Sequence, residues 1–389
     1  MTQINNSQSV PIIVSIIPDL LGGQGHVYDY HQAVGKAANL IGCKHLAAIP
    51  PDTIIKNFPP NWNTCLSSDN LEWETATIFK IFQVKSIYDW AVKLAKYLRQ
   101  EVLPNSDNVV IFLERFIISH LLAIILTLWL IPTNNLSVWL LYRRDTHNQK
   151  NRIIYKILNN IIKVMLPNNR FKIITDSQLL SKSLSQYFAE PVYVMPIPHT
   201  EMIYNDNFPK ENNDILCWWV GSPREEKGLS MIKSLASYIS KNEHKICLLA
   251  AQSSQIKTIS GGLQIQLIQD NLTRIEYLKW LATCDICLLP YNSIDYKERT
   301  SGIFVECVIA GKIPLVTDNT WMAKELCKYQ LEELIIDWKQ PGMVIDKILK
   351  IAQNSEIKLK LNRMQNEYKK FHSLQGYAEE INKILWKNT

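Results

Sequence analysis

The feature that most constrains this 389-residue chain is a repeated alternation of short apolar segments with helix-like segments, which runs in two series. Alternating strands and helices favour a parallel β-sheet with helices on both faces. In the first series we expect strands at 10–18, 43–51, 109–114, 137–143, 171–176 and 191–198. The helices expected between them lie at 27–41, 86–103, 116–131, 152–165 and 177–188.

A polar segment, HTEMIYNDNFPKENN (199–213), separates the two series and has no regular apolar period. After it, we expect strands at 215–222, 244–251, 284–291 and 312–318, and the chain closes with helices at 357–371 and 374–386. The sequence therefore predicts an α/β protein with domains at 1–199 and 214–370. The remaining parts are a linker at 200–213 and a C-terminal helix at 371–389.

Composition indicates a soluble globular protein, with 47% apolar and 20% charged residues. The net charge of +6 is too mild to imply nucleic acid, and the chain shows no nucleic-acid-binding module. Its eight cysteines are scattered, which favours reduced thiols over a disulfide framework. Cys284 and Cys287 form a C-x-x-C inside a strand pattern without a second pair, so we assign no metal site.

The chain start and the longest apolar run both favour a cytoplasmic protein. The first residues, MTQINNSQSV, are polar and uncharged, unlike a signal peptide. The apolar run at 116–131 is shorter than the roughly 20 residues that a membrane span needs. We interpret this run as a buried helix.

The segment 284–323 combines a buried strand, a polar loop, Ser301-Gly302 and a helix that carries Glu306. Backbone N–H groups at the start of such a helix point outward, and the helix dipole there favours negative charge. The pattern is typical of a phosphate site. An unpaired carboxylate inside the apolar helix IFVECVIAG would be costly, which argues for a ligand at Glu306.

Two further segments follow expected strands and precede expected helices. In GSPREEKG (221–228), Arg224 and Lys227 lie three apart and share one face of a helix start. Such a start is either a solvated surface or an anion site. The turn GGQGH (22–26) is the densest glycine cluster, and it is either an ordinary turn or a close approach to a ligand. It lacks the spacing of the dinucleotide fingerprint.

These motifs resemble those of retaining glycosyltransferases of family 4 type, which have the GT-B fold of two Rossmann-like domains facing across a cleft. The resemblance covers most of the chain and is strongest at 215–228 and 284–323. Glu298 and Glu306 match the E-x7-E pattern, whereas Gly311-Lys312-Ile313-Pro314 is one residue longer than the family's Gly-Lys-Pro. In this fold the last helix returns to the N-terminal domain.

The resemblance implies a donor site for a nucleotide-diphosphate sugar. Arg224, Lys227 and the Ser301-Gly302 amides would hold the diphosphate, assisted by Arg299, and Glu306 would hold the ribose. The donor-binding residues implied in this way are Gly23, Gly25, His26, Arg224, Lys227, Tyr291, Arg299, Ser301, Gly302 and Glu306. Tyr291 would line the base or sugar site, and the Gly23–His26 turn would face the donor phosphates.

The acceptor side departs from the family pattern. Strand 109–114 ends at Glu114, where family members often place a histidine, and no histidine follows this strand directly. His120 falls inside the apolar helix, where a core role is the more natural interpretation. The implied catalytic residues are therefore Glu114, Glu298 and Lys227, with Glu114 orienting substrate and Glu298 either contacting the sugar or lying exposed.

The expected activity is transfer of a sugar from a nucleotide-diphosphate sugar to a glycan or lipid-linked acceptor. No D-x-D motif occurs, so we expect a metal-independent reaction without a cofactor. The alternatives are a non-catalytic nucleotide-sugar-binding or scaffold subunit and another GT-B enzyme such as a sugar-nucleotide epimerase. The basic stretch 143–172 either covers the sheet or lies on an anionic membrane surface, which would place the protein on the inner face of a membrane.

Overall fold

The structure is a computed structural model that describes residues 9–20, 26–55, 58–72, 80–201, 214–239 and 245–386. The chain divides into two compact units. The first combines Met1–His199 with Leu374–Thr389, and the second is Thr200–Ser373. Most of the expected linker, residues 202–213, lies outside the described residues.

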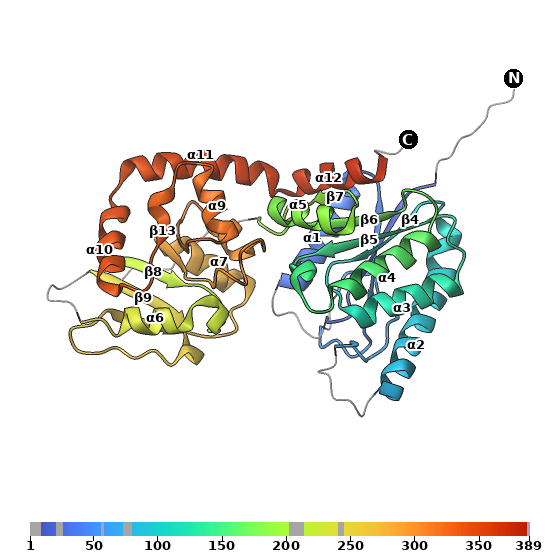
Figure 1. The fold of residues 1–389 in the computed structure, drawn as a ribbon, viewed down its shortest axis with the longest axis horizontal. Helices are drawn as coiled ribbons and strands as arrows, with labels where there is room; N and C mark the ends of the chain where they lie inside the picture. Colours follow the sequence, from blue (N-terminus) through green and yellow to red (C-terminus); the bar gives the residue numbers. More distant parts are fainter. Residues whose placement is uncertain are drawn as a thin grey trace, which may run out of the picture. The chain divides into compact units, whose positions relative to one another are not determined.

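The first unit contains a seven-stranded parallel sheet in the order β3-β2-β1-β4-β5-β6-β7 (Figure 1). Its strands are β1 (Ile12–Ile16), β2 (Lys44–Ile49), β3 (Trp62–Thr64), β4 (Val109–Leu113), β5 (Leu136–Tyr142), β6 (Phe171–Thr175) and β7 (Val192–Val194). Its helices are α1 (His26–Leu40), α2 (Lys80–Tyr97), α3 (Ile118–Leu130), α4 (Arg152–Met165), α5 (Gln178–Phe188) and α12 (Leu374–Trp386).

Strand alternation divides the core of this unit into two layers, because successive side chains point to opposite faces of a sheet. In β4, Val109, Ile111 and Leu113 join the layer that contains buried residues of α2, α3, α4 and α5. Val110 and Phe112 join the layer under α1 and α12. The strand β4 is therefore apolar along its whole length, and its charged residues follow where it ends.

The second unit contains a six-stranded parallel sheet in the order β10-β9-β8-β11-β12-β13. Its strands are β8 (Ile215–Trp219), β9 (Ile246–Ala251), β10 (Gln264–Ile268), β11 (Ile286–Leu289), β12 (Ile313–Thr317) and β13 (Ile335–Ile336). Its helices are α6 (Leu229–Ala236), α7 (Arg274–Thr283), α8 (Gly302–Ile309), α9 (Trp321–Cys327), α10 (Pro341–Ala352) and α11 (Ser355–Phe371).

The predicted fold class of two Rossmann-like parallel-sheet domains is confirmed. The edge strands β3, β10 and β13 were not predicted, because short or exposed edge strands lack the continuous apolar pattern of central ones. In β10, only Ile268 is buried. Within the described residues, no helix combines the length and the apolar character needed to cross a membrane.

Candidate functional site

The residues predicted to bind an anion lie at the carboxyl edge of the second sheet, after β8 and β11. These two strands are neighbours, with β9 and β10 on one side and β12 and β13 on the other. The chain order therefore reverses between β8 and β11. Ligands of open α/β sheets bind at such a reversal, outside the carboxyl ends of the strands.

Lys227 is held close to this reversal by its own backbone and by Gly221. The Lys227 carbonyl accepts a hydrogen bond from Trp219 Nε1 at 3.0 Å. Gly221 has a φ of +93°, and a Cβ there would lie 2.9 Å from Lys227 Nζ. The same Cβ would lie 3.3 Å from Ile303 Cδ1, so the lysine amine lies beside the first turn of α8.

The environment of Lys227 disfavours its charge. Burial, together with the positive charges of Arg224 and Arg299, lowers the pKa of Lys227 to about 8. The ammonium lies 5.8 Å from the ring centroid of Tyr291, which is itself 1% exposed. Glu226 offsets this effect only in part, and an anion beside the lysine would favour its charged form.

Arg224 and Arg299 extend the positive charge on either side. Arg224 is 53% exposed and pairs with Glu226 at 3.0 Å. The guanidinium of Arg299 lies 4.9 Å from the ring centroid of Tyr296, and that ring packs 4.5 Å from the ring of Tyr291. The two tyrosines therefore connect the loop that carries Arg299 to the position of Lys227.

Helix α8 begins at this same place. Its N-cap is Ser301, which is 4% exposed and whose hydroxyl oxygen accepts a hydrogen bond from the Phe304 N–H at 3.2 Å. The N–H groups of the first helical residues, Gly302 and Ile303, have no partner inside a helix. An anion beside Lys227 would meet these groups.

Glu306 lies one turn further along α8 and is 5% exposed. Its Oε1 accepts a hydrogen bond from Arg274 Nη1 at 2.5 Å, and its Oε2 accepts one from the Tyr277 hydroxyl at 2.7 Å. Glu306 therefore does not need a ligand in order to be paired, because Arg274 and Tyr277 of α7 already hydrogen-bond to its two oxygens. The spacing of Arg274 and Tyr277 in α7 gave no sign of this contact.

Glu298 lies in the half-buried loop between β11 and α8. The structure thus brings Arg224, Lys227, Arg299, Ser301 and Gly302 to one sheet edge, with Tyr291 beneath them. Gly23 and Gly25 lie outside the described residues, as does the side chain of His26, whose backbone begins α1.

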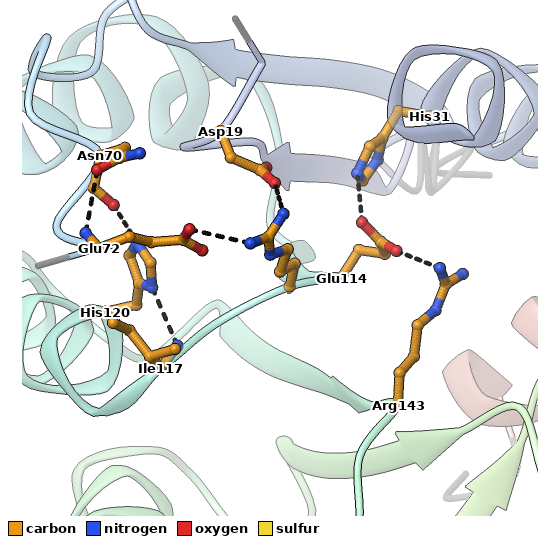
Figure 2. Close-up of polar contacts among 9 residues, drawn as sticks. Asp19, His31, Asn70, Glu72, Glu114, Ile117, His120 and Arg143 are labelled. Carbon is orange, nitrogen blue, oxygen red and sulfur yellow. Dashed lines mark hydrogen bonds and ion pairs between the residues drawn. The ribbon is translucent and has the colours of Figure 1, made fainter. Parts of the chain in front are cut away.

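In the first unit, Glu114 lies at the carboxyl end of β4 and is 3% exposed (Figure 2). Its Oε1 pairs with Arg143 Nη1 at 2.5 Å, and its Oε2 lies 3.7 Å from His31 Nε2. Arg143 follows β5, and its Nε lies 3.4 Å from an oxygen of Asp176, which follows β6. Three successive strands therefore end in a buried charge cluster.

A histidine does reach this edge, although none directly follows β4 in sequence. His31 comes from the second turn of α1 and is fully buried. Local sequence does not predict this contact, because the place of His31 beside Glu114 depends on how α1 packs on the sheet. Arg143 and Asp176 were missed as partners for the same reason.

Two tyrosines connect this cluster to α12. The Arg143 guanidinium stacks 4.5 Å from the ring centroid of Tyr30, whose hydroxyl lies 2.9 Å from that of Tyr377. Burial opposes the charge of Arg143, but Glu114, Tyr30 and Asp176 together outweigh it, so the pKa of Arg143 lies above its ordinary value. Burial likewise raises the pKa of Tyr30. The guanidinium stays charged and the phenol stays neutral.

His120 is a buried histidine whose ring is hydrogen-bonded inside the protein. Its Nδ1 accepts a hydrogen bond from the Ile117 N–H at 3.0 Å, and its Nε2 lies 2.8 Å from the Asn70 carbonyl oxygen (Figure 2). Burial lowers its pKa to about 4, so the ring is neutral at pH 7. Both ring nitrogens are occupied in closing the start of α3.

Solved structures with the same fold include several enzymes of sugar metabolism. A glycosyltransferase from Rickettsia africae is 12% identical with a TM-score of 0.68, over 98% of this chain and all of that one. Sucrose-phosphate synthase from Thermosynechococcus elongatus is 12% identical with a TM-score of 0.65, over 96% and 98%. Anabaena HepE in complex with UDP-glucose is 11% identical with a TM-score of 0.63, over 97% and 99%. No family model and no curated protein sequence matches the chain. These likenesses establish the two-domain GT-B fold.

The close approach of the two site loops predicts that Gly228→Ala is disruptive. Gly228 has a φ of +84°, and a Cβ there would lie 2.2 Å from the Pro290 carbonyl oxygen. We expect a loss in the free energy of unfolding of more than about 2 kcal/mol, measured by urea denaturation. Gly42→Ala is the matched control, because Gly42 has a φ of +74° with nothing within 4 Å. Its loss should be about 1 kcal/mol, and an equal loss in both variants would contradict the packing account.

Proposed function

We propose that this chain is a retaining, metal-independent glycosyltransferase that uses a nucleotide-diphosphate sugar. The observation that carries the proposal is the set of cations Arg224, Lys227 and Arg299 beside the start of α8, at the strand-order reversal of the second sheet. Proteins with this fold include glycosyltransferases and a protein solved with UDP-glucose, which supports a donor of this class.

The diphosphate would lie between Lys227 and the Gly302 and Ile303 N–H groups. A donor diphosphate carries about two negative charges, and the departing nucleotide gains charge in the transition state. Fixed cations and helix N–H groups stabilise that charge without transferring a proton. Burial lowers the pKa of Lys227 to about 8, and a bound anion would favour its charged form.

The ribose would be held by Glu306. Each carboxylate oxygen has two acceptor sites, so the bonds to Arg274 and Tyr277 leave one site on each oxygen. The remaining acceptor site on each oxygen would accept a hydrogen bond from one of two ribose hydroxyls. The contacts from α7 thus position Glu306 for the role that the E-x7-E motif implies.

The first unit would supply the acceptor side. Glu114 is fixed by Arg143 and lies near His31, which suits it to orient a sugar hydroxyl. In a retaining reaction on one face of the sugar, the leaving phosphate itself takes the acceptor proton. Glu114 therefore need not act as a base, and Glu298 would contact the donor sugar from the loop before α8.

Donor binding and turnover test this assignment against a non-catalytic binding subunit and an epimerase. We would measure binding of UDP-, GDP-, ADP- and dTDP-sugars calorimetrically, and turnover with acceptor present and absent, with and without EDTA. The transferase account expects one nucleotide to bind, transfer with retained anomeric configuration, and no effect of EDTA. Binding without turnover favours the scaffold subunit, and conversion of donor without acceptor favours the epimerase.

Glu306→Gln should weaken donor binding about tenfold or more, because ribose loses a charged acceptor. The matched control is Glu325→Gln. Glu325 is also buried in the second unit and accepts hydrogen bonds from a cation and a tyrosine, Lys328 at 2.6 Å and Tyr368 at 2.9 Å. Similar losses of affinity in both variants would show that Glu306 has only a structural role.

The lowered pKa of Lys227 predicts that donor binding depends on pH. A diphosphate binds the ammonium form, and the pKa of Lys227 in the free protein is about 8. The dissociation constant for the nucleotide sugar that binds, whose doubly esterified diphosphate does not titrate near neutral pH, should be constant below about pH 7 and rise about tenfold per unit above pH 8. Lys227→Met should bind weakly at every pH. An unchanged pH profile in that variant would contradict the role of Lys227.

A further inference from the structure

Helices α3 and α4 lie side by side on one face of the first sheet and leave seven large apolar side chains exposed (Figure 1). We call this surface the α3–α4 face. Trp129 is 78% exposed and Val164 is 85% exposed, values far above those of a packed side chain. The face consists of Leu122, Trp129, Ile153, Ile154, Ile157, Ile161 and Val164.

The orientation of α4 turns its exposed apolar side toward α3. Lys156 Nζ donates to the Tyr187 carbonyl at 3.0 Å, and Lys163 pairs with Glu190, so both lysines point toward the C-terminal end of α5. At 100° per residue, Ile157 and Ile161 lie about 100–140° around the helix from Lys156. The exposed isoleucines therefore continue the exposed surface of α3, forming one face.

Charge on this face has one sign. Neither α3 nor α4 contains an acidic residue, and Asp145 is the only acid between Arg115 and Asp176. Arg144, Lys150 and Arg152 are exposed just before and at the start of α4. An exposed apolar surface of this kind, bordered by cations, marks an interaction site rather than an ordinary solvated surface.

We propose that the α3–α4 face docks on an anionic lipid bilayer, with the isoleucines and Trp129 in the interface and the exposed cations Arg144 and Lys150 against the headgroups. Indole side chains favour the boundary between lipid and water. This differs from attraction by the whole basic stretch 143–172, because much of that stretch has partners inside the protein. Arg143 pairs with Glu114, and Arg170 donates to Asn108 at 2.6 Å.

The chemistry of the face favours a bilayer over a second protein surface. Its flexible aliphatic side chains and single indole contain one polar atom, the Trp129 N–H, so the face lacks the hydrogen-bonding groups of a specific protein interface. The adjacent cations match anionic headgroups. If the proposed function holds, the acceptor would be lipid-linked. The loop with Arg144 and Lys150 begins directly after Arg143, which pairs with Glu114, the residue proposed to orient the acceptor.

Vesicle flotation tests the docking without any donor or acceptor, so its outcome is independent of the transferase assignment. Wild type should float with vesicles of 70% phosphatidylcholine and 30% phosphatidylglycerol, and much less with pure phosphatidylcholine. The combined variant Ile157→Ser, Ile161→Ser and Val164→Ser should lose about tenfold or more in partitioning. Arg144→Glu with Lys150→Glu should abolish the preference for anionic vesicles.

The matched control replaces three equally exposed apolar side chains elsewhere. Ile54, Met343 and Leu359 are 77%, 64% and 72% exposed, and their combined change to serine should leave flotation unchanged. Failure of wild type to float, or equal loss in this control, would overturn the proposal. The proposal would also be overturned if light scattering without vesicles gave a dimeric mass, and if the combined Ile157→Ser, Ile161→Ser and Val164→Ser variant were monomeric. A second copy of the chain would then cover the α3–α4 face.

Discussion

The pairing of β8 with β11 decides where this chain gathers positive charge. Because these strands are neighbours, the loops that leave their carboxyl ends must share one sheet edge. One loop carries Arg224 and Lys227, and the other carries Arg299 and the start of α8. The approach of Gly228 to Pro290 holds the two loops in contact and leaves room for no side chain at residue 228. Burial there disfavours the charge on Lys227, and under the proposed function a bound anion would compensate for this effect.

The first unit also gathers charged residues at the carboxyl ends of neighbouring strands, but there opposite charges pair with one another. Its strands β4, β5 and β6 end in Glu114, Arg143 and Asp176, where one guanidinium pairs with two mostly buried carboxylates. Buried ion pairs of this kind add little to stability, because desolvation offsets their attraction. Their effect is to fix the orientation of Glu114 and to connect the sheet edge to α12 through Tyr30 and Tyr377.

The sequence predicted the fold class and central strands well, because buried parallel strands are continuous apolar runs bounded by polar turns. It also predicted which residues follow β8 and β11, because motif spacing is local. It did not predict contacts between elements distant in sequence. His31 beside Glu114, and Arg274 with Tyr277 on Glu306, depend on helix packing that no local spacing records. The sequence also left open whether the basic stretch 143–172 covers the sheet or lies on a membrane, because it does not show that Lys156 and Lys163 bind the end of α5.

Amide hydrogen exchange with and without nucleotide sugars tests the central claim most directly, because it locates the donor on the backbone. The account predicts that one class of nucleotide sugar slows exchange in two segments of the second unit, 221–228 and 301–305, where the site loops and the first turn of α8 lie. Slower exchange confined to other segments, or no change at 221–228 and 301–305 with any donor that binds, would contradict the placement of the diphosphate beside Lys227 and α8.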